Sequence, residues 1–497
     1  MAHSLVVRAG VQRLAADGST AVVLVGQRRH LAPLTYDGPL KDALQTFVRD
    51  EEHWKTAISR LPKTSGRIPL HFDLAHVVTV PDTASRYNSP SNSVSVFKEV
   101  KSIAFPEDVK NIHFVLYAEY SHVLSSVAAV ARCFPKFSLK TAKKNVENIH
   151  IDVVVPGGPN LKEKDTKFLN DLCEAIRETG RLIDIPANIL TTDKLVDEAV
   201  SVGKSLGAKI HIVRGDELLQ QGFGGIYHVG KAALTPPAFV VLSKEVSGSD
   251  ESYALVGKGV VYDTGGMQIK GKTGMPNMKR DMGGAAGMLH AFSTLVRNGF
   301  NKTLHACLCI VENNISPVAN KPDDIITMLS GKSVEINNTD AEGRLILADG
   351  VFYAKETLKA TTIIDMATLT GAQSYLSGKL HAAAMTNDEE LENNILTAGR
   401  ASGDLVAPMI FAPDLYSADL KSPVADMRNS NLGKMDGPPS AVAGLFIGAH
   451  IKYGQGIRWL HLDIAAPAEH ADRGTGFGPA LFSSLLGNHT DVPLLRH

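Results

Sequence analysis

The stretch Val256-Gly-Lys-Gly-Val-Val-Tyr-Asp-Thr-Gly-Gly-Met-Gln-Ile-Lys270 joins an apolar run to a polar turn. The run is typical of a buried β-strand that ends at Asp263, and the Thr-Gly-Gly that follows lets the backbone bend sharply. A lysine inside an apolar strand is costly unless it is paired or used, so Lys258 is a candidate functional residue, as is Lys270 after the turn. The alternative is an edge strand whose lysines extend into solvent.

Apolar runs of strand length recur along the chain, separated by helical or glycine-rich stretches. They lie at Thr20–Val25, Ile112–Tyr117, Ile149–Val155, Lys209–Val213, Phe239–Leu242, Ala254–Tyr262, Leu304–Val311, Ser333–Ile336, Thr361–Met366 and Ile457–Ile464. This alternation predicts an α/β fold, in which a larger C-terminal part carries a central, mostly parallel twisted sheet. Ligands bind at the carboxyl ends of strands in such sheets, which is where several polar clusters fall.

The length of 497 residues suggests two to three folding units. We expect an N-terminal α/β domain over residues 1–163, a linker helix over 164–180 and a C-terminal domain over 181–497. The helix is predicted by apolar residues at helical spacing between Phe168 and Ile176, with Gly180 as its C-cap.

Charge and cysteine content exclude some classes of function. The chain has 51 basic and 52 acidic residues, so it offers no general attraction to nucleic acid or to an anionic membrane. Cys307 and Cys309 alternate within an apolar run and are interpreted as small core residues, with a zinc pair as the alternative. The N-terminus lacks a long apolar signal region and no stretch reaches the roughly 20 apolar residues of a membrane span, so we expect a cytoplasmic protein.

A second polar cluster, Met278-Lys-Arg-Asp-Met-Gly-Gly-Ala-Ala-Gly287, places Asp281 before a run of small residues. Such a run can begin a tightly packed helix. Taken alone, the cluster favours Asp281 as a helix N-cap over a functional role.

A third cluster, Ile336-Asn-Asn-Thr-Asp-Ala-Glu-Gly-Arg344, lies between a strand and a helical pattern. Asp340, Glu342 and Arg344 alternate, so an extended segment would point all three in one direction. Converging carboxylates suit hard or borderline divalent cations. The alternative is a charged loop at a helix entry.

Together the clusters supply four carboxylates and a lysine that could ligate through its neutral amine. This set could hold two cations about 3.5–4 Å apart, as in metal-assisted hydrolases. The three segments contain no histidine, and the chain contains neither H-E-x-x-H nor G-x-S-x-G, which argues against zincins and serine hydrolases. We interpret His461 and Asp463, within a predicted strand, as buried structural residues.

The third cluster also resembles the most diagnostic motif of a known family, the leucine aminopeptidases, which are two-metal cytosolic enzymes. Further matches occur in the expected order at Asp184–Asn188, Val256–Lys270, Asp281–Ala286, Ala367–Ala372 and Trp459–Ile464. The resemblance covers roughly residues 180–490 and is weak to absent over the first third.

The resemblance implies a role for each matching residue. Lys258, Asp263, Asp281 and Glu342 would hold one metal ion, and Asp263, Asp340 and Glu342 the other. The ions would be Zn²⁺ or Mn²⁺, with Mg²⁺ or Co²⁺ as alternatives. Lys270 would stabilise the oxyanion, and Arg344 would hold a bicarbonate ion that acts as general base. The residues bordering the substrate's N-terminal residue would be Met278, Thr368, Leu369 and Gly371.

The resemblance further implies a catalytic metallopeptidase domain that releases apolar, leucine-like N-terminal residues from peptides, in a homohexamer without membrane or nucleic-acid partners. Two other hypotheses stay open at this point. One is a scaffold or nucleic-acid-binding member of the same fold, and the other is a two-metal phosphoesterase.

Overall fold

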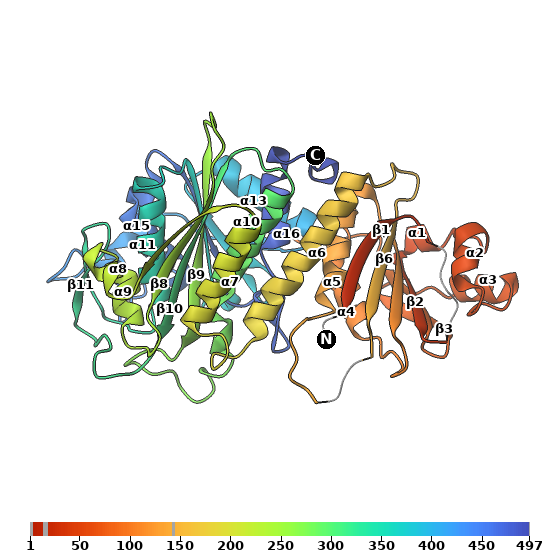
Figure 1. The fold of residues 1–497 in the computed structure, drawn as a ribbon, viewed down its shortest axis with the longest axis horizontal. Coiled ribbons are helices and arrows are strands. Elements are labelled where there is room, and N and C mark those ends of the chain that lie inside the picture. The colour runs from red at the N-terminus through yellow and green to blue at the C-terminus, as the bar shows by residue number, and fades with distance from the viewer. Residues whose placement is uncertain (1–2, 13–17, 142–144, 497) are drawn as a thin grey trace. The chain divides into compact units, whose positions relative to one another are not determined.

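The computed structural model describes residues 3–12, 18–141 and 145–496 (Figure 1). The chain forms two compact units. The first comprises residues 1–178, 398–405 and 480–497, and the second comprises residues 179–397 and 406–479. The limits 1–163, 164–180 and 181–497 stay predictions for independently folding domains.

The first unit is built on a six-stranded sheet of order β1-β6-β5-β2-β4-β3. All neighbouring strands are parallel except β3 and β4. The strands are β1 (Ser4–Ala9), β2 (Thr20–Gln27), β3 (Gly66–His71), β4 (Ala75–Val80), β5 (Asn111–Tyr117) and β6 (Asn148–Val154). The three strands expected here are confirmed as β2, β5 and β6, whereas β1, β3 and β4 were not predicted. The helices are α1 (Arg28–Leu31), α2 (Gly38–Leu44), α3 (Glu51–Ser59), α4 (Ser93–Lys101) and α5 (Val123–Arg132).

The second unit is built on an eight-stranded, mostly parallel sheet of order β15-β14-β17-β13-β9-β10-β8-β7. Its strands are β7 (Lys209–Arg214), β8 (Ala238–Lys244), β9 (Ser252–Asp263), β10 (Thr303–Asn313), β13 (Thr362–Ala367), β14 (Ala382–Thr386), β15 (Val406–Pro408) and β17 (Arg458–Asp463). The predicted fold class is therefore confirmed. The expected strand at 333–336 exists as β12 (Ser333–Glu335), but it pairs with β11 (Ile325–Thr327) and β16 (Met427–Arg428) in a separate small sheet.

Helices cover both faces of this large sheet (Figure 1). On one face α11 (Gly343–Glu356) and α15 (Pro439–His450) share a hydrophobic core with Val256, Cys307 and Cys309. Both cysteines are fully buried, which confirms them as core residues. On the other face α10 (Gly283–Arg297) packs against β9 and lies beside α7 (Thr192–Ser205).

Glycine allows α10 to approach β9 closely. A Cβ on Gly257 of β9 would lie 2.6 Å from the Cα of Ala285, and one on Gly284 would lie 2.1 Å from the carbonyl oxygen of Met366. Any larger residue would push the helix away from the sheet. This contact brings the turn that precedes α10 next to the middle of β9.

The helix predicted over 164–180 is part of α6 (Glu163–Asp184). Gly180 lies inside this helix, so its prediction as a C-cap is wrong. The physical reason for glycine is close packing, because a Cβ on Gly180 would lie 3.1 Å from the carbonyl oxygen of Gly474. Among the described residues, no helix combines the length and the apolar character of a membrane span.

Candidate metal centre

The predicted ligands converge at the carboxyl end of β9. Asp263 is the last residue of that strand, and Asp281 lies in a 3₁₀ turn, η2 (Met278–Met282), before α10. Asp340 lies in the loop between β12 and α11, and Glu342 immediately precedes α11. Asp263, Asp340 and Glu342 each place one carboxylate oxygen within 4.8 Å of the other two.

Lys258 is buried at the centre of this cluster, with a residue exposure of 2%. Its Nζ lies 2.8 Å from Asp281 Oδ2 and 2.9 Å from Glu342 Oε1, and it donates a hydrogen bond of 2.9 Å to the carbonyl oxygen of Thr368. Burial lowers the pKa of Lys258, but the carboxylates of Asp281 and Glu342 outweigh it and hold the pKa above its ordinary value. The alternative interpretation of this segment, an edge strand whose lysines extend into solvent, is therefore wrong. β9 lies inside the sheet, and Lys258 is paired with carboxylates.

Lys270 reaches back over the glycine turn to the other side of the cluster. Its Nζ lies 2.7 Å from Asp263 Oδ2 and forms a close ion pair with Asp340. Partial burial lowers its pKa, yet the neighbouring carboxylates of Asp263 and Glu342 raise it above the ordinary value overall. The ammonium group therefore stays charged at neutral pH.

Burial raises the pKa of Asp281, Asp340 and Glu342. Burial, together with the charge of Asp263, raises the pKa of Glu342 to about 8 against the attraction of Lys258. Burial is also the main cause that raises the pKa of Asp281 to about 6 and the pKa of Asp340 above its ordinary value. A positive charge added to the cluster would relieve this repulsion.

The donor set fits divalent cations. Four carboxyl groups (Asp263, Asp281, Asp340 and Glu342) face two ammonium groups, so the cluster has an excess of two negative charges when all four are ionised. Within the described residues, Glu342 Oε2 is buried and has no hydrogen-bond partner. A buried carboxylate oxygen without a partner is costly unless a cation or a donor meets it, and oxygen-rich clusters suit hard or borderline divalent ions.

Asp281 does not cap α10, which corrects the reading favoured for its segment alone. The helix begins at Gly283 after Met282, without a side-chain cap. Asp281 instead accepts a hydrogen bond of 2.8 Å from Thr368 Oγ1, besides its contact with Lys258. The carboxylate is thus used inside the cluster rather than at the helix end.

Arg344 does not share an extended segment with Asp340 and Glu342, so that prediction is also wrong. Glu342 already has helical dihedral angles, and α11 begins at Gly343. Arg344 is buried, and its Nη1 donates a hydrogen bond of 3.0 Å to the carbonyl oxygen of Asn429. Burial lowers its pKa to about 10, although nearby Glu342 opposes the shift. Its Nε has no hydrogen-bond partner within the described part of the chain, which leaves a buried donor for an anion.

The predicted substrate residues lie near the same end of the sheet. Thr368, Leu369 and Gly371 follow β13, the parallel neighbour of β9, and Met278 begins the turn that carries Asp281. Thr368 contacts both Lys258 and Asp281 directly. Leu369 is held by its amide, which donates to Asp463 Oδ1 over 3.1 Å.

Asp463 and His461 are fully buried, as predicted for structural residues. Nδ1 of His461 lies 2.5 Å from Oδ1 of Asp365, and Asp463 accepts the side-chain hydroxyl of Thr370 over 2.7 Å. These contacts fix β17 against β13 and hold the loop that follows β13.

Sequence reasoning missed the asparagines that surround the cluster. Asn313 at the end of β10 donates to Asp263 Oδ1 over 2.8 Å and to the carbonyl oxygen of Thr339 over 3.1 Å. Asn429 contacts the loop that carries Asp340. Asparagine is also common in surface turns, so only the end of a buried strand at Asn313 offered a signal.

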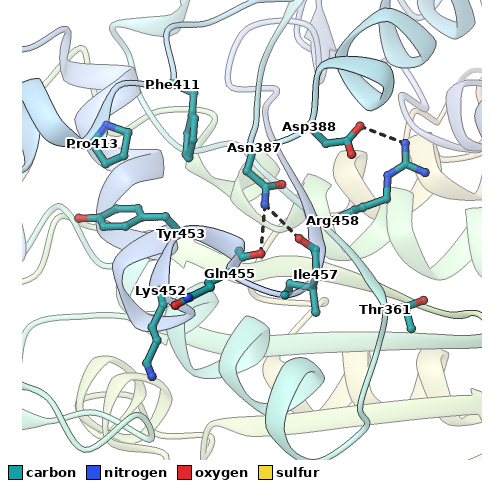
Figure 2. Close-up of a pocket in the computed structure, with 12 residues that line it drawn as sticks. Thr361, Asn387, Asp388, Phe411, Pro413, Lys452, Tyr453, Gln455, Ile457 and Arg458 are labelled. Atoms are coloured by element: carbon teal, nitrogen blue, oxygen red, sulfur yellow. Dashed lines mark hydrogen bonds and ion pairs between the residues drawn. The ribbon is translucent and has the colours of Figure 1, made fainter.

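A hollow with a volume of about 660 Å³ lies at the opposite end of the sheet (Figure 2). Thr361 and Arg458, at the starts of β13 and β17, line it, as do Asn387 and Phe411. In Figure 2 the Asn387 side chain points to the carbonyl oxygen of Ile457, and its Nδ2 also donates to the carbonyl oxygen of Gly454. The hollow contains none of the four carboxylates, so chemistry rather than cavity size identifies the candidate site.

Comparisons with known proteins agree with this geometry. The catalytic domain of the cytosol aminopeptidase family matches residues 178–482, and M17 aminopeptidase N-terminal domain 2 matches residues 20–143. The second match extends the likeness into the first third, where sequence reasoning found little.

Relatives match over nearly the whole chain. Leucine aminopeptidase 1 of Caenorhabditis elegans is 69% identical over 99% of both chains, and its solved structure superposes with a TM-score of 0.96. Probable aminopeptidase NPEPL1 of Homo sapiens is 44% identical over 96% of this chain and 92% of its own. Leucyl aminopeptidase from Trypanosoma brucei, solved in complex with actinonin, is 32% identical over 98% of this chain and 96% of its own, with a TM-score of 0.85.

Proposed function

This chain belongs to the cytosol aminopeptidase family and is a metal-dependent aminopeptidase, and we propose that its buried acidic cluster is the site that holds two divalent cations. The observation that carries the proposal is the convergence of Asp263, Asp340 and Glu342 within 4.8 Å, beside the pair formed by Lys258 and Asp281. The scaffold or nucleic-acid-binding alternative is not favoured by these relatives.

Each predicted ligand receives a place in this proposal. One cation would be held by Lys258, Asp263, Asp281 and Glu342, and the other by Asp263, Asp340 and Glu342. Two bound cations would supply Lewis acidity and a nucleophile at neutral pH. Lys258 would have to give up its proton to ligate, and its protonated form already lies against the carboxylates that would share the ion.

Lys270 and Arg344 would perform the remaining steps. Lys270, which the carboxylates keep protonated, would direct its ammonium toward the oxyanion of the attacked carbonyl, where preorganised charge contributes several kcal/mol. Arg344 would hold a bicarbonate ion that takes up a proton. Its buried Nε, which lacks a partner within the described residues, supports an anion there.

The substrates would be peptides with an apolar, leucine-like N-terminal residue. Met278, Thr368, Leu369 and Gly371 would border the side chain of that residue. Thr368 supports this placement, because it contacts two of the proposed ligands. The names of the relatives support the leucine preference.

The test is hydrolysis of a panel of amino-acid amides after the protein is loaded with zinc, manganese, magnesium or cobalt. We expect leucinamide to be among the fastest substrates, and zinc or manganese to give the highest kcat/KM. A chromogenic phosphate ester serves as the control and should stay intact. Cleavage of the ester with no turnover of any amide would contradict the proposal.

Location and assembly complete the proposal. We place the protein in the cytoplasm, which the description of its family as cytosol aminopeptidases supports. The homohexamer rests on the resemblance of the motifs. Light scattering during size-exclusion chromatography tests it, and a mass near six times 53.2 kDa is the expected result.

A further inference from the structure

Asn429 is a fully buried asparagine whose side chain uses its complete hydrogen-bonding capacity. Its Oδ1 accepts from the backbone amides of Asn337, over 3.0 Å, and Asn338, over 3.1 Å. Its Nδ2 donates to the carbonyl oxygens of Asn338, over 2.6 Å, and Ala341, over 3.2 Å. One amide group thus spans the loop from residue 337 to residue 341.

This loop carries Asp340 and leads directly to Glu342, two of the proposed metal ligands. The backbone carbonyl of Asn429 also accepts a hydrogen bond of 3.0 Å from Arg344 Nη1. A single residue of the chain therefore contacts both the loop of the ligands and the arginine beside them. Because α11 begins between Glu342 and Arg344, these contacts fix the helix start as well.

Ser430, the residue after Asn429, makes further contacts with Asn337. The backbone amide and the hydroxyl of Ser430 both donate to Asn337 Oδ1, over 3.0 and 2.9 Å. Segments 337–341 and 429–430 are therefore interlocked through side chains of both. We call this set of contacts the Asn429 clamp.

We propose that Asn429 is a positioning residue for the reaction, which holds Asp340, Glu342 and Arg344 in the arrangement that the two cations require. The inference rests on the proposed function of the cluster. The competing explanation is that the clamp only stabilises the fold. Groups that orient metal ligands typically change metal affinity or activity by about 10- to 100-fold when they are removed, whereas a purely structural tether would lower thermal stability alone.

The chain offers a matched control in Asn387. Its Nδ2 donates to the carbonyl oxygens of Gly454 and Ile457, over 3.1 and 3.0 Å, and its Oδ1 accepts from the amide of Trp459 over 2.8 Å (Figure 2). It is thus an asparagine that holds a loop through its amide, as Asn429 does, but at the opposite end of the sheet.

The experiment compares Asn429→Ala, Asn387→Ala and Asp340→Ala in the full chain. The probe is manganese, added to chelated protein while bound metal is measured by calorimetry, and each loaded variant is then assayed for kcat, KM and Tm. We expect Asn429→Ala to raise the metal Kd by about 10- to 100-fold and to lower kcat more than it changes KM. Asn387→Ala should lower Tm and leave the metal Kd within about twofold of wild type.

Two other results would distinguish failure of the positioning role of Asn429 from failure of the proposed metal site. If Asn429→Ala and Asn387→Ala both lower Tm without changing the metal Kd, while Asp340→Ala weakens metal binding, Asn429 is not a positioning residue and the site stands. If Asp340→Ala also binds manganese as wild type does, the proposed site has failed instead. Should Asn429→Ala not fold, Ser430→Ala removes one hydroxyl of the clamp. A folded Ser430→Ala is expected to bind manganese several-fold more weakly, and an unchanged Kd would overturn the inference.

Discussion

Nζ of Lys258 and Oε1 of Glu342 lie 2.9 Å apart, with side-chain exposures of only 3% and 2%. The pair joins the middle of β9 to the start of α11, and its two residues are 84 positions apart in the sequence. A buried ion pair is retained at a considerable desolvation cost, and removal of one partner leaves an uncompensated charge. In an enzyme whose activity depends on metal, this pair is the most informative place to begin mutagenesis.

Lys270→Ala should lower kcat by roughly 10²- to 10³-fold, equivalent to about 2.7–4 kcal/mol, and leave both metals bound. The reason is that Lys270 is partly exposed beyond the glycine turn and would act on the oxyanion rather than on an ion. Elemental analysis together with kcat and KM measures both effects.

Lys258→Ala should act differently, with one metal lost or bound more weakly, because Lys258 is proposed to ligate one ion through its buried amine. Both lysines belong to one fifteen-residue segment, so each variant is the control for the other. If Lys270→Ala empties a metal site and Lys258→Ala retains two ions, the two roles have been assigned in reverse.

Glu342→Ala should reduce metal content and activity more than Asp340→Ala. Glu342 is proposed to bridge both ions and is almost fully buried, whereas the side chain of Asp340 is 37% exposed, where water can replace it as a ligand. Loss of a bridge also leaves two positive charges without an intervening anion. Equal metal stoichiometry and equal kcat in the two variants would argue against the bridging role.

His450 should make the free energy of unfolding depend on pH. Burial, with a smaller contribution from Lys332, lowers the pKa of this histidine to about 3, whereas an unfolded chain has a pKa near 6.5. Between these values the unfolded state binds more protons, so stability is retained above pH 6.5 and lost as the pH falls toward 3. One such group changes the free energy of unfolding by at most about 1.4 kcal/mol per pH unit.

Urea unfolding of wild type and His450→Gln between pH 7 and pH 4 measures this contribution. The difference in the free energy of unfolding between the two proteins should shrink as the pH is lowered. Only wild type contains a histidine that is protonated on unfolding and held neutral in the folded state. A difference between wild type and His450→Gln that stays constant from pH 7 to pH 4 would refute the assignment.

Strand positions were largely predictable, because buried parallel strands are continuous apolar runs. The prediction succeeded for β9, β10 and β13. These strands lie inside the sheet and are buried along almost their whole length, so their sequences are apolar. It failed for β1 and β3, which lie at the edges of their sheet and carry polar or proline residues, and also for β4, which is a buried internal strand. Edge strands need fewer apolar side chains, so their sequences resemble loops.

The candidate site was predictable as a set of residue types but not as a geometry. Asp281 follows the local rule for a helix cap, yet tertiary packing of α10 on β9 places it against Lys258 instead. Glu342 was expected in an extended segment because the helical pattern was taken to begin after Arg344, whereas α11 begins at Gly343. Asn429 gave no local signal, since its partners lie about 90 residues away in the sequence.

The central claim is that activity requires two cations in the cluster of Asp263, Asp281, Asp340 and Glu342. The most direct test is leucinamide hydrolysis after exhaustive chelation, with metal content determined by elemental analysis on the same sample. The account predicts that activity disappears with the metal and that manganese or zinc restores it, at two ions per chain. Undiminished turnover by protein that contains no metal would contradict it.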